Sequence, residues 1–129
     1  MGLVTITGTL ATDESPIRSA TSSFVIDVID SFDTTQAVGT SYELVASASD
    51  AGTGQMWTVV ENKGTQEAVV RCNLDGTNYT FFPLPGLSTM LIPTAMASSA
   101  LTTPTIVSSV YARALTGSST LRVLALFVA

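Results

Sequence analysis

The sequence predicts an all-β fold, namely an antiparallel β-sandwich of jelly-roll type with about eight or nine short strands. Three observations support this prediction. Apolar residues recur at every second position or in short continuous runs, which is the spacing of strands rather than of helices. These runs lie about ten residues apart and are separated by Gly, Pro, Asn and Asp. Ser and Thr form roughly a quarter of the chain, and they favour turns and strands respectively.

The first half of the chain predicts three strands. Residues 3–9 alternate apolar side chains with Thr and indicate the first strand. Residues 11–21 contain a proline, which disfavours helix at the residue before it, so we expect a loop or an arm. Residues 24–32 are apolar on both faces, which indicates a strand at the centre of a sheet or at an interface. We expect residues 33–40 to turn and residues 42–46 to form a short strand.

The second half of the chain predicts six strands joined by short turns. Residues 47–54 are rich in small side chains and indicate a flexible connection. Pro85 and Gly86 suit the centre of a type II turn. Residues 94–103 are ambiguous, because one helical turn would fit there before the next proline ends it. The expected strands are residues 55–61, 66–73, 78–82, 87–92, 106–112 and 119–128.

The last predicted strand is apolar on both faces and supplies the candidate interface. Such a strand promotes aggregation when it is exposed, so we expect it at the centre of a sheet or between subunits. The length of 129 residues fits a single domain, with an N-terminal strand and arm at residues 1–21 and the sandwich at 22–129. The candidate oligomer or assembly interface consists of Leu121, Val123, Leu124, Leu126, Phe127 and Val128.

Composition argues against several classes of partner. Charged residues make up 12% of the chain and the net charge is −5. Nucleic-acid and anionic-membrane binding both need clustered basic residues, so we expect neither partner. The chain has one cysteine and no basic, apolar leader at its start, so we expect production in a cytoplasm. The five basic residues are scattered at Arg18, Lys63, Arg71, Arg113 and Arg122.

The residues that most catalytic sites need are scarce, so we expect no enzyme activity and no cofactor. The chain has no histidine, which removes the commonest general base and metal ligand. Cys72 lies in an apolar strand and is expected to be a small buried side chain rather than a nucleophile. Asp27, Asp30 and Asp33 recur at every third position and raise a calcium hypothesis. The competing interpretation is that Asp30 and Asp33 solvate a strand end and the turn after it.

Several strand and turn sequences together resemble a known class of protein. The pattern is similar to that of small tailed-bacteriophage virion proteins, found as capsid decoration (cement) proteins or as neck and tail accessories. The resemblance covers roughly residues 24–128; Arg113 stands where that pattern has Lys, and residues 94–103 are longer than in the pattern. The sequences that carry it are Glu61-Asn62-Lys63-Gly64-Thr65, Ala68-Val69-Val70-Arg71, Phe81-Phe82-Pro83-Leu84-Pro85-Gly86, Val110-Tyr111-Ala112-Arg113-Ala114 and Ser119-Thr120-Leu121-Arg122-Val123-Leu124-Ala125, with Ala37-Val38-Gly39-Thr40-Ser41-Tyr42-Glu43-Leu44 upstream.

The resemblance implies a non-enzymatic structural role in a virion assembled in the host cytoplasm. The implied function is that of a decoration or cement protein that binds and stabilises the phage head. The implied partners are further copies of the chain, as a homotrimer, and other virion proteins, including the major capsid protein. One alternative is an accessory structural protein of the neck, tail or baseplate.

A glycan-binding β-sandwich module is the alternative from a different class. It requires exposed aromatic side chains, and the candidates are Trp57, Tyr79, Phe81 and Tyr111. Trp57 lies within an apolar strand, where packing in the core is the stronger interpretation.

Overall fold

A computed structural model of the chain describes residues 2–51, 54–74, 78–95 and 106–128. Within these residues the chain forms nine strands and one short 3₁₀ helix, η1 (Ala48–Asp50). The strands are β1 (Gly2–Leu10), β2 (Ala20–Val38), β3 (Glu43–Ser47), β4 (Gln55–Asn62), β5 (Ala68–Asn73), β6 (Tyr79–Leu84), β7 (Thr89–Ala95), β8 (Ser109–Ala114) and β9 (Ser119–Val128).

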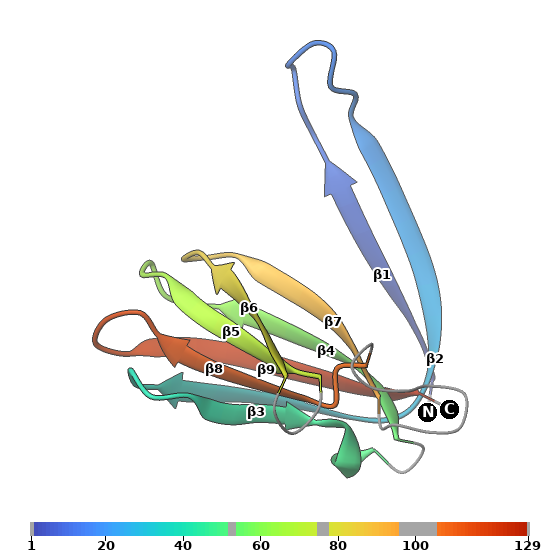
Figure 1. Cartoon of the computed structure of the whole chain (residues 1–129). Helices are drawn as coiled ribbons and strands as arrows, with labels where there is room; N and C mark the ends of the chain where they lie inside the picture. The colour runs from blue at the N-terminus through green and yellow to red at the C-terminus, as the bar shows by residue number, and fades with distance from the viewer. Residues whose placement is uncertain (1, 52–53, 75–77, 96–105, 129) are drawn as a thin grey trace.

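The strands form two antiparallel sheets that pack face to face (Figure 1). The five-stranded sheet has the order β1-β2-β9-β4-β7, and the four-stranded sheet has the order β3-β8-β5-β6. The predicted all-β antiparallel sandwich is confirmed. With β1 set aside, β2-β9-β4-β7 faces β3-β8-β5-β6, an order compatible with the two interleaved Greek keys of a jelly roll.

The core lies between the two sheets, because alternate residues of each central strand point inward. Strand β9 pairs with β2 on one side and β4 on the other, so it is central in its sheet. Its side chains Leu121 and Val123 have no exposed surface. The sequence predicted this strand either at the centre of a sheet or between subunits, and the structure places it at the centre of a sheet.

Strand β2 is longer than expected, and the turn predicted at residues 33–40 is wrong. The strand spans 19 residues, and its second half pairs with β9 from Asp30 to Val38. The polar residues 33–36 suggested a turn, but pairing along β9 holds them extended, because tertiary context overrides local strand propensity. The chain leaves the strand only at Gly39.

A β-bulge at Ile29 moves the side chains of β2 from one face of the sheet to the other. The register shifts between Val28, which pairs with Val128, and Asp30, which pairs with Phe127. Before the bulge, the even-numbered side chains pack on the outer face of the five-stranded sheet; after it, they point toward the core. One additional residue has this effect because side chains alternate with a period of two.

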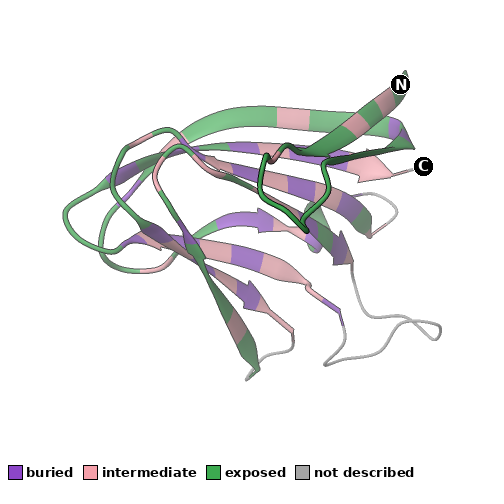
Figure 2. Cartoon of the chain, turned by 90° about the horizontal axis from the view of Figure 1, so that it is seen from above, coloured by how far each residue is buried: buried purple, intermediate pink, exposed green. Residues whose placement is uncertain are grey.

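Residues 2–28 form a hairpin, which we call the arm, that packs at its base on the outer face of the five-stranded sheet and projects away from the sandwich (Figure 1). Ile26 and Val28 are buried there against Leu126, with Trp57 beside them. Most other positions of the arm are exposed (Figure 2). The arm extends past residue 21, where the sequence placed its end, because the first half of β2 pairs with β1 rather than with the sandwich.

Two prolines that were expected to end strands lie within them instead. Pro83 is in β6 and Pro93 is in β7, and each of these strands is at the edge of its sheet. An edge strand tolerates proline because one side of its backbone needs no hydrogen-bond donor. Residues 94–95 end β7, whereas residues 96–103 of the ambiguous segment lie outside the described residues.

The turn between β6 and β7 is centred one residue later than expected. Ser88 N donates to Pro85 O at 3.2 Å, which places Gly86 and Leu87 at the centre of the turn. Leu87 has the positive φ of 63° that this turn requires. Glycine precedes it because a side chain at Gly86 would overlap the backbone of Thr65.

We predict that Gly86→Ala destabilises the fold by about 2 kcal/mol or more, because the added methyl group meets backbone that cannot move aside. The matched control is Gly39→Ala, where a methyl group has open space and glycine has no positive φ. The free energy of unfolding in urea measures both changes. Equal stability of the two variants would contradict the packing assigned to this turn.

Candidate functional site

The outer face of the four-stranded sheet carries a row of large side chains. In the register of the sheet, Arg71 of β5 lies between Tyr111 of β8 and Phe81 of β6, and Leu44 of β3 lies beyond Tyr111. The neighbours of Arg71 in its own strand, Val70 and Cys72, point into the core. Alternation therefore places the aromatic and basic side chains together on the outside.

Arg71 is surrounded by aromatic rings. Its guanidinium carbon lies 4.7 Å from the ring centroid of Tyr42, 4.6 Å from that of Tyr79 and 4.4 Å from that of Tyr111. All three distances are within the range of a cation–π contact. Arg113 approaches the Tyr42 ring at 5.4 Å.

Phe81 completes this group of rings and is its most exposed member. Its ring centroid lies 6.0 Å from that of Tyr42 and 6.4 Å from that of Tyr79. Phe81 is 54% exposed and Tyr79 is 42% exposed, so the surface of the group is open to solvent. We call the group the Arg71 cluster; it consists of Tyr42, Arg71, Tyr79, Phe81, Tyr111 and Arg113.

The two arginines of the cluster are not neutralised by carboxylates among the described residues. Arg71 Nε donates to Asn73 Oδ1 at 3.2 Å, and Arg113 Nη1 donates to the carbonyl oxygen of Ala114 at 3.2 Å. In the described part of the chain, the basic residues with ion pairs are Lys63 and Arg122. The Arg71 cluster is therefore a positive, aromatic surface on a chain whose net charge is −5.

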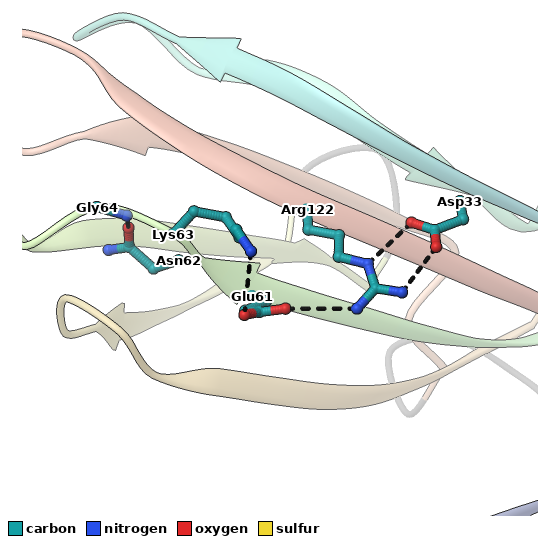
Figure 3. A network of polar contacts seen from close by, with 6 residues as sticks. All are labelled: Asp33, Glu61, Asn62, Lys63, Gly64 and Arg122. Carbon is teal, nitrogen blue, oxygen red and sulfur yellow. Dashed lines mark hydrogen bonds and ion pairs between the residues drawn. The ribbon is translucent and has the colours of Figure 1, made fainter.

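A different polar network crosses the outer face of the five-stranded sheet (Figure 3). Arg122 of β9 donates from Nε and Nη2 to Asp33 of β2 at 3.0 and 2.7 Å, and its Nη1 lies 3.7 Å from Glu61 of β4. The hydrogen bonds from Arg122 hold the pKa of Asp33 below its usual value. Exposed pairs of this kind contribute little free energy, so the network mainly ties three strands in register.

The buried amide of Asn62 serves the backbone. Its Nδ2 donates to the carbonyl oxygens of Gln66 and Leu84 at 2.8 and 3.1 Å, and its Oδ1 accepts from Gly64 N at 3.0 Å. Three hydrogen bonds satisfy the side chain and hold the β4–β5 connection against the end of β6. This arrangement is structural.

The three aspartates of the calcium hypothesis are not brought together. Asp33 binds Arg122, Asp30 Oδ1 accepts from Ser31 N at 2.8 Å, and Asp27 lies in the arm opposite Leu3. No group of three His, Cys, Asp or Glu side chains in the described residues is placed to hold a metal ion. The hypothesis therefore receives no geometric support.

The candidate interface residues of β9 are covered within the chain. Leu121 and Val123 lie in the core, and Leu126 lies beneath the arm. Leu124 and Val128 are partly buried beside Leu126. Phe127 packs at the core against Phe32, with ring centroids 6.0 Å apart. Most of the apolar surface of β9 is covered within the chain, and the interface assigned to these six residues stays a prediction.

The aromatic candidates of the sequence separate onto two faces. Trp57 lies beside the arm, with its ring centroid 5.1 Å from that of Phe24, whereas Tyr79, Phe81 and Tyr111 belong to the Arg71 cluster. Sequence reasoning missed the other three members, Tyr42, Arg71 and Arg113. Strand alternation could have placed Arg71 and Arg113 on the outer face, but the contribution of Tyr42 depends on contacts across the sheet.

Comparison of the chain with protein-family models, curated proteins and solved structures finds no match. In the described residues, no helix has the length and apolar character needed to cross a membrane.

Cys72 provides a test of the core beneath the cluster. Its side chain is 1% exposed, and burial raises the pKa of the thiol from 9.0 to about 11. We predict that the native protein reacts with a thiol reagent near pH 8 at least about a hundredfold more slowly than the protein unfolded in urea, because its thiolate fraction is lower by that factor.

The same shift predicts how stability changes in alkali. Folding raises the pKa of Cys72, so the associated stability is present below the ordinary thiol pKa and is lost as the pH rises through about 11. Urea unfolding at several pH values between 9.0 and about 11 gives the free energy of unfolding of the wild type and of Cys72→Ala. The free energy should fall with pH more steeply in the wild type than in the variant.

Both predictions depend on burial of Cys72. If the native thiol were labelled as fast as the unfolded thiol, Cys72 would be accessible and both would be wrong.

Proposed function

We propose that the protein is a non-enzymatic virion structural protein that decorates and stabilises a phage head. It would act through contacts between its own copies, as a homotrimer, and with the major capsid protein. The observation that carries this proposal is the arm, which exposes apolar side chains and the unpaired edge of strand β1.

The outward face of the arm carries two exposed apolar side chains among Thr, Ser and Asp residues. Leu3 is 75% exposed and Val25 is 58% exposed, and the register places them on the face opposite Val4 and Ile26. Leu10, at the end of β1 on the same face as Val4, is 53% exposed. We infer that these exposed apolar side chains contact a second molecule.

The backbone of the arm is also open on one side. Strand β1 is nine residues long and lies at the edge of the five-stranded sheet, where β2 is its neighbour. An isolated two-stranded hairpin is marginally stable in water, and an unpaired edge accepts a further strand. A neighbouring molecule that pairs with β1 would stabilise the hairpin.

A groove beneath the arm offers a second contact. It has a volume of about 430 Å³ and lies between the arm, represented by Ile6 and Phe24, and the sheet, represented by Val59 and Leu91. We propose that the arm of a second copy occupies it. If the arm of each copy binds in the groove of the next, the copies can form a closed ring with cyclic symmetry, as is usual for oligomers.

The strand order adds support at the level of the fold. An arrangement compatible with a jelly roll recurs in viral capsid and lectin domains. Because one fold serves many functions, the arm rather than the topology carries the argument. The proposed interface therefore moves from the apolar residues of β9 to the arm.

An accessory role at the neck, tail or baseplate would use the same arm and remains the alternative proposal. The two locations differ in the number of copies for each particle. Quantitative mass spectrometry of separated heads and tails distinguishes them, since a decoration protein is abundant in the head fraction.

We predict that the purified chain is a trimer and that the double variant Leu3→Glu, Val25→Glu is a monomer. Both side chains are exposed, so the substitutions place charges in the interface and change the stability of the single chain by less than about 0.5 kcal/mol. Light scattering after size exclusion measures the molar mass.

The control is Leu115→Glu, which adds one negative charge at a 46% exposed leucine outside the arm and should leave the trimer intact. A wild-type monomer, or a double variant with the wild-type mass, would overturn the role of the arm in self-association.

A further inference from the structure

We propose that the Arg71 cluster binds saccharides that carry carboxylate groups, such as chains of uronic acids. The cluster lies on the outer face of the four-stranded sheet, whereas the arm packs on part of the outer face of the other sheet. The two surfaces are on opposite sides of the sandwich. The site therefore goes beyond the proposed assembly role and does not depend on it.

The exposed rings supply the apolar part of the site. A pyranose ring has a face formed by C–H groups, and such a face packs on an aromatic ring. Phe81 and Tyr79 are the open rings of the cluster, and Tyr42 packs beside Phe81. The tyrosines combine an apolar ring with a hydroxyl group that can bond to a sugar hydroxyl.

The arginines select a charged sugar over a neutral one. The rings of Tyr42, Tyr79 and Tyr111 pack around the guanidinium of Arg71, and Nε is held by Asn73. The N–H groups of Nη1 and Nη2 have no acceptor among the described residues. A guanidinium held in this way is preorganised for two parallel hydrogen bonds to a carboxylate.

The distribution of charge favours the same ligand. The chain has a net charge of −5, and Arg71 and Arg113 contribute +2, so all other residues together carry −7. An anion is thus repelled by most of the molecule and attracted by this face. Two cations suit one or two carboxylates, whereas a nucleic-acid backbone needs a longer basic track.

The position of the cluster within the sheet disfavours a peptide. Arg71 lies in β5, which pairs with both β6 and β8, so its backbone is already hydrogen-bonded on both sides. An extended peptide binds by adding a strand to an open edge. Such a strand would pair with β6, the edge strand next to β5, and would lie one strand away from Arg71. Recognition must rely on side-chain surfaces, as it does for a saccharide.

The experiment compares a charged probe with its neutral methyl ester. The full-length protein is titrated with an oligogalacturonate and with the same oligosaccharide after methyl esterification, and binding is followed by calorimetry and by NMR. We expect the acidic probe to bind at least about tenfold more tightly, and its affinity to fall as salt is added.

Substitutions test the assignment to Arg71. Arg71→Gln should abolish the preference for the acidic probe, and Phe81→Ala should weaken both probes while keeping that preference. The matched control is Arg122→Gln, which removes an arginine from the opposite face and should bind like the wild type. The thermal unfolding midpoint of each variant shows whether it is folded. If Arg71→Gln does not fold, Phe81→Ala still tests whether the cluster binds the probes.

Four results would overturn the proposal: no binding of either probe, equal binding of both, loss of binding in Arg122→Gln, or polyglutamate binding as tightly as oligogalacturonate. Equal binding would indicate a site for neutral sugars, and tight binding of polyglutamate would indicate a site for acidic peptides. The molar mass of the protein is independent of these titrations, so failure of this proposal leaves the assembly proposal standing.

Discussion

The bulge at Ile29 is the constraint on which the rest of the architecture depends. Strand β2 belongs to two structures, because its first half pairs with β1 in the arm and its second half pairs with β9 in the sandwich. The apolar residues of the two halves must face opposite sides of the sheet. A strand with strict alternation cannot do this, and one additional residue reverses the faces. The same bulge therefore lets Val28 pack outside the sandwich and Phe32 pack toward the core.

The reversal produces two apolar clusters from one continuous sheet. The larger cluster fills the space between the sheets, and the smaller one joins the arm to the outer surface around Leu126. The smaller cluster covers only the base and inner face of the hairpin, so Leu3 and Val25 remain exposed. This partial cover is the physical basis for placing the intermolecular contacts on the arm. The same two clusters bury most of the apolar side chains of the last strand.

The two outer faces use their arginines differently. On the five-stranded sheet, Arg122 is paired with Asp33 and Glu61 and serves the structure. On the four-stranded sheet, Arg71 is held by aromatic rings and keeps hydrogen-bond donors free of described partners. Ion pairing uses the hydrogen-bond donors of a guanidinium, whereas contact with aromatic rings does not neutralise its charge. The proposed binding site therefore lies on the second face.

Features that depend on neighbouring residues could be predicted from the amino-acid sequence. Period-two alternation located β1, β4, β5 and β9 closely, and the lack of histidine restricted the available chemistry. Tertiary structure decided what depends on strand pairing. Residues 33–36 are polar and suggest a turn, yet pairing with β9 extends them. Tyr42 joins Arg71, and Trp57 separates from the other aromatic candidates, because the register across a sheet brings together residues far apart in the chain. Local patterns determine which face a side chain occupies, but only the partner strand determines what lies beside it.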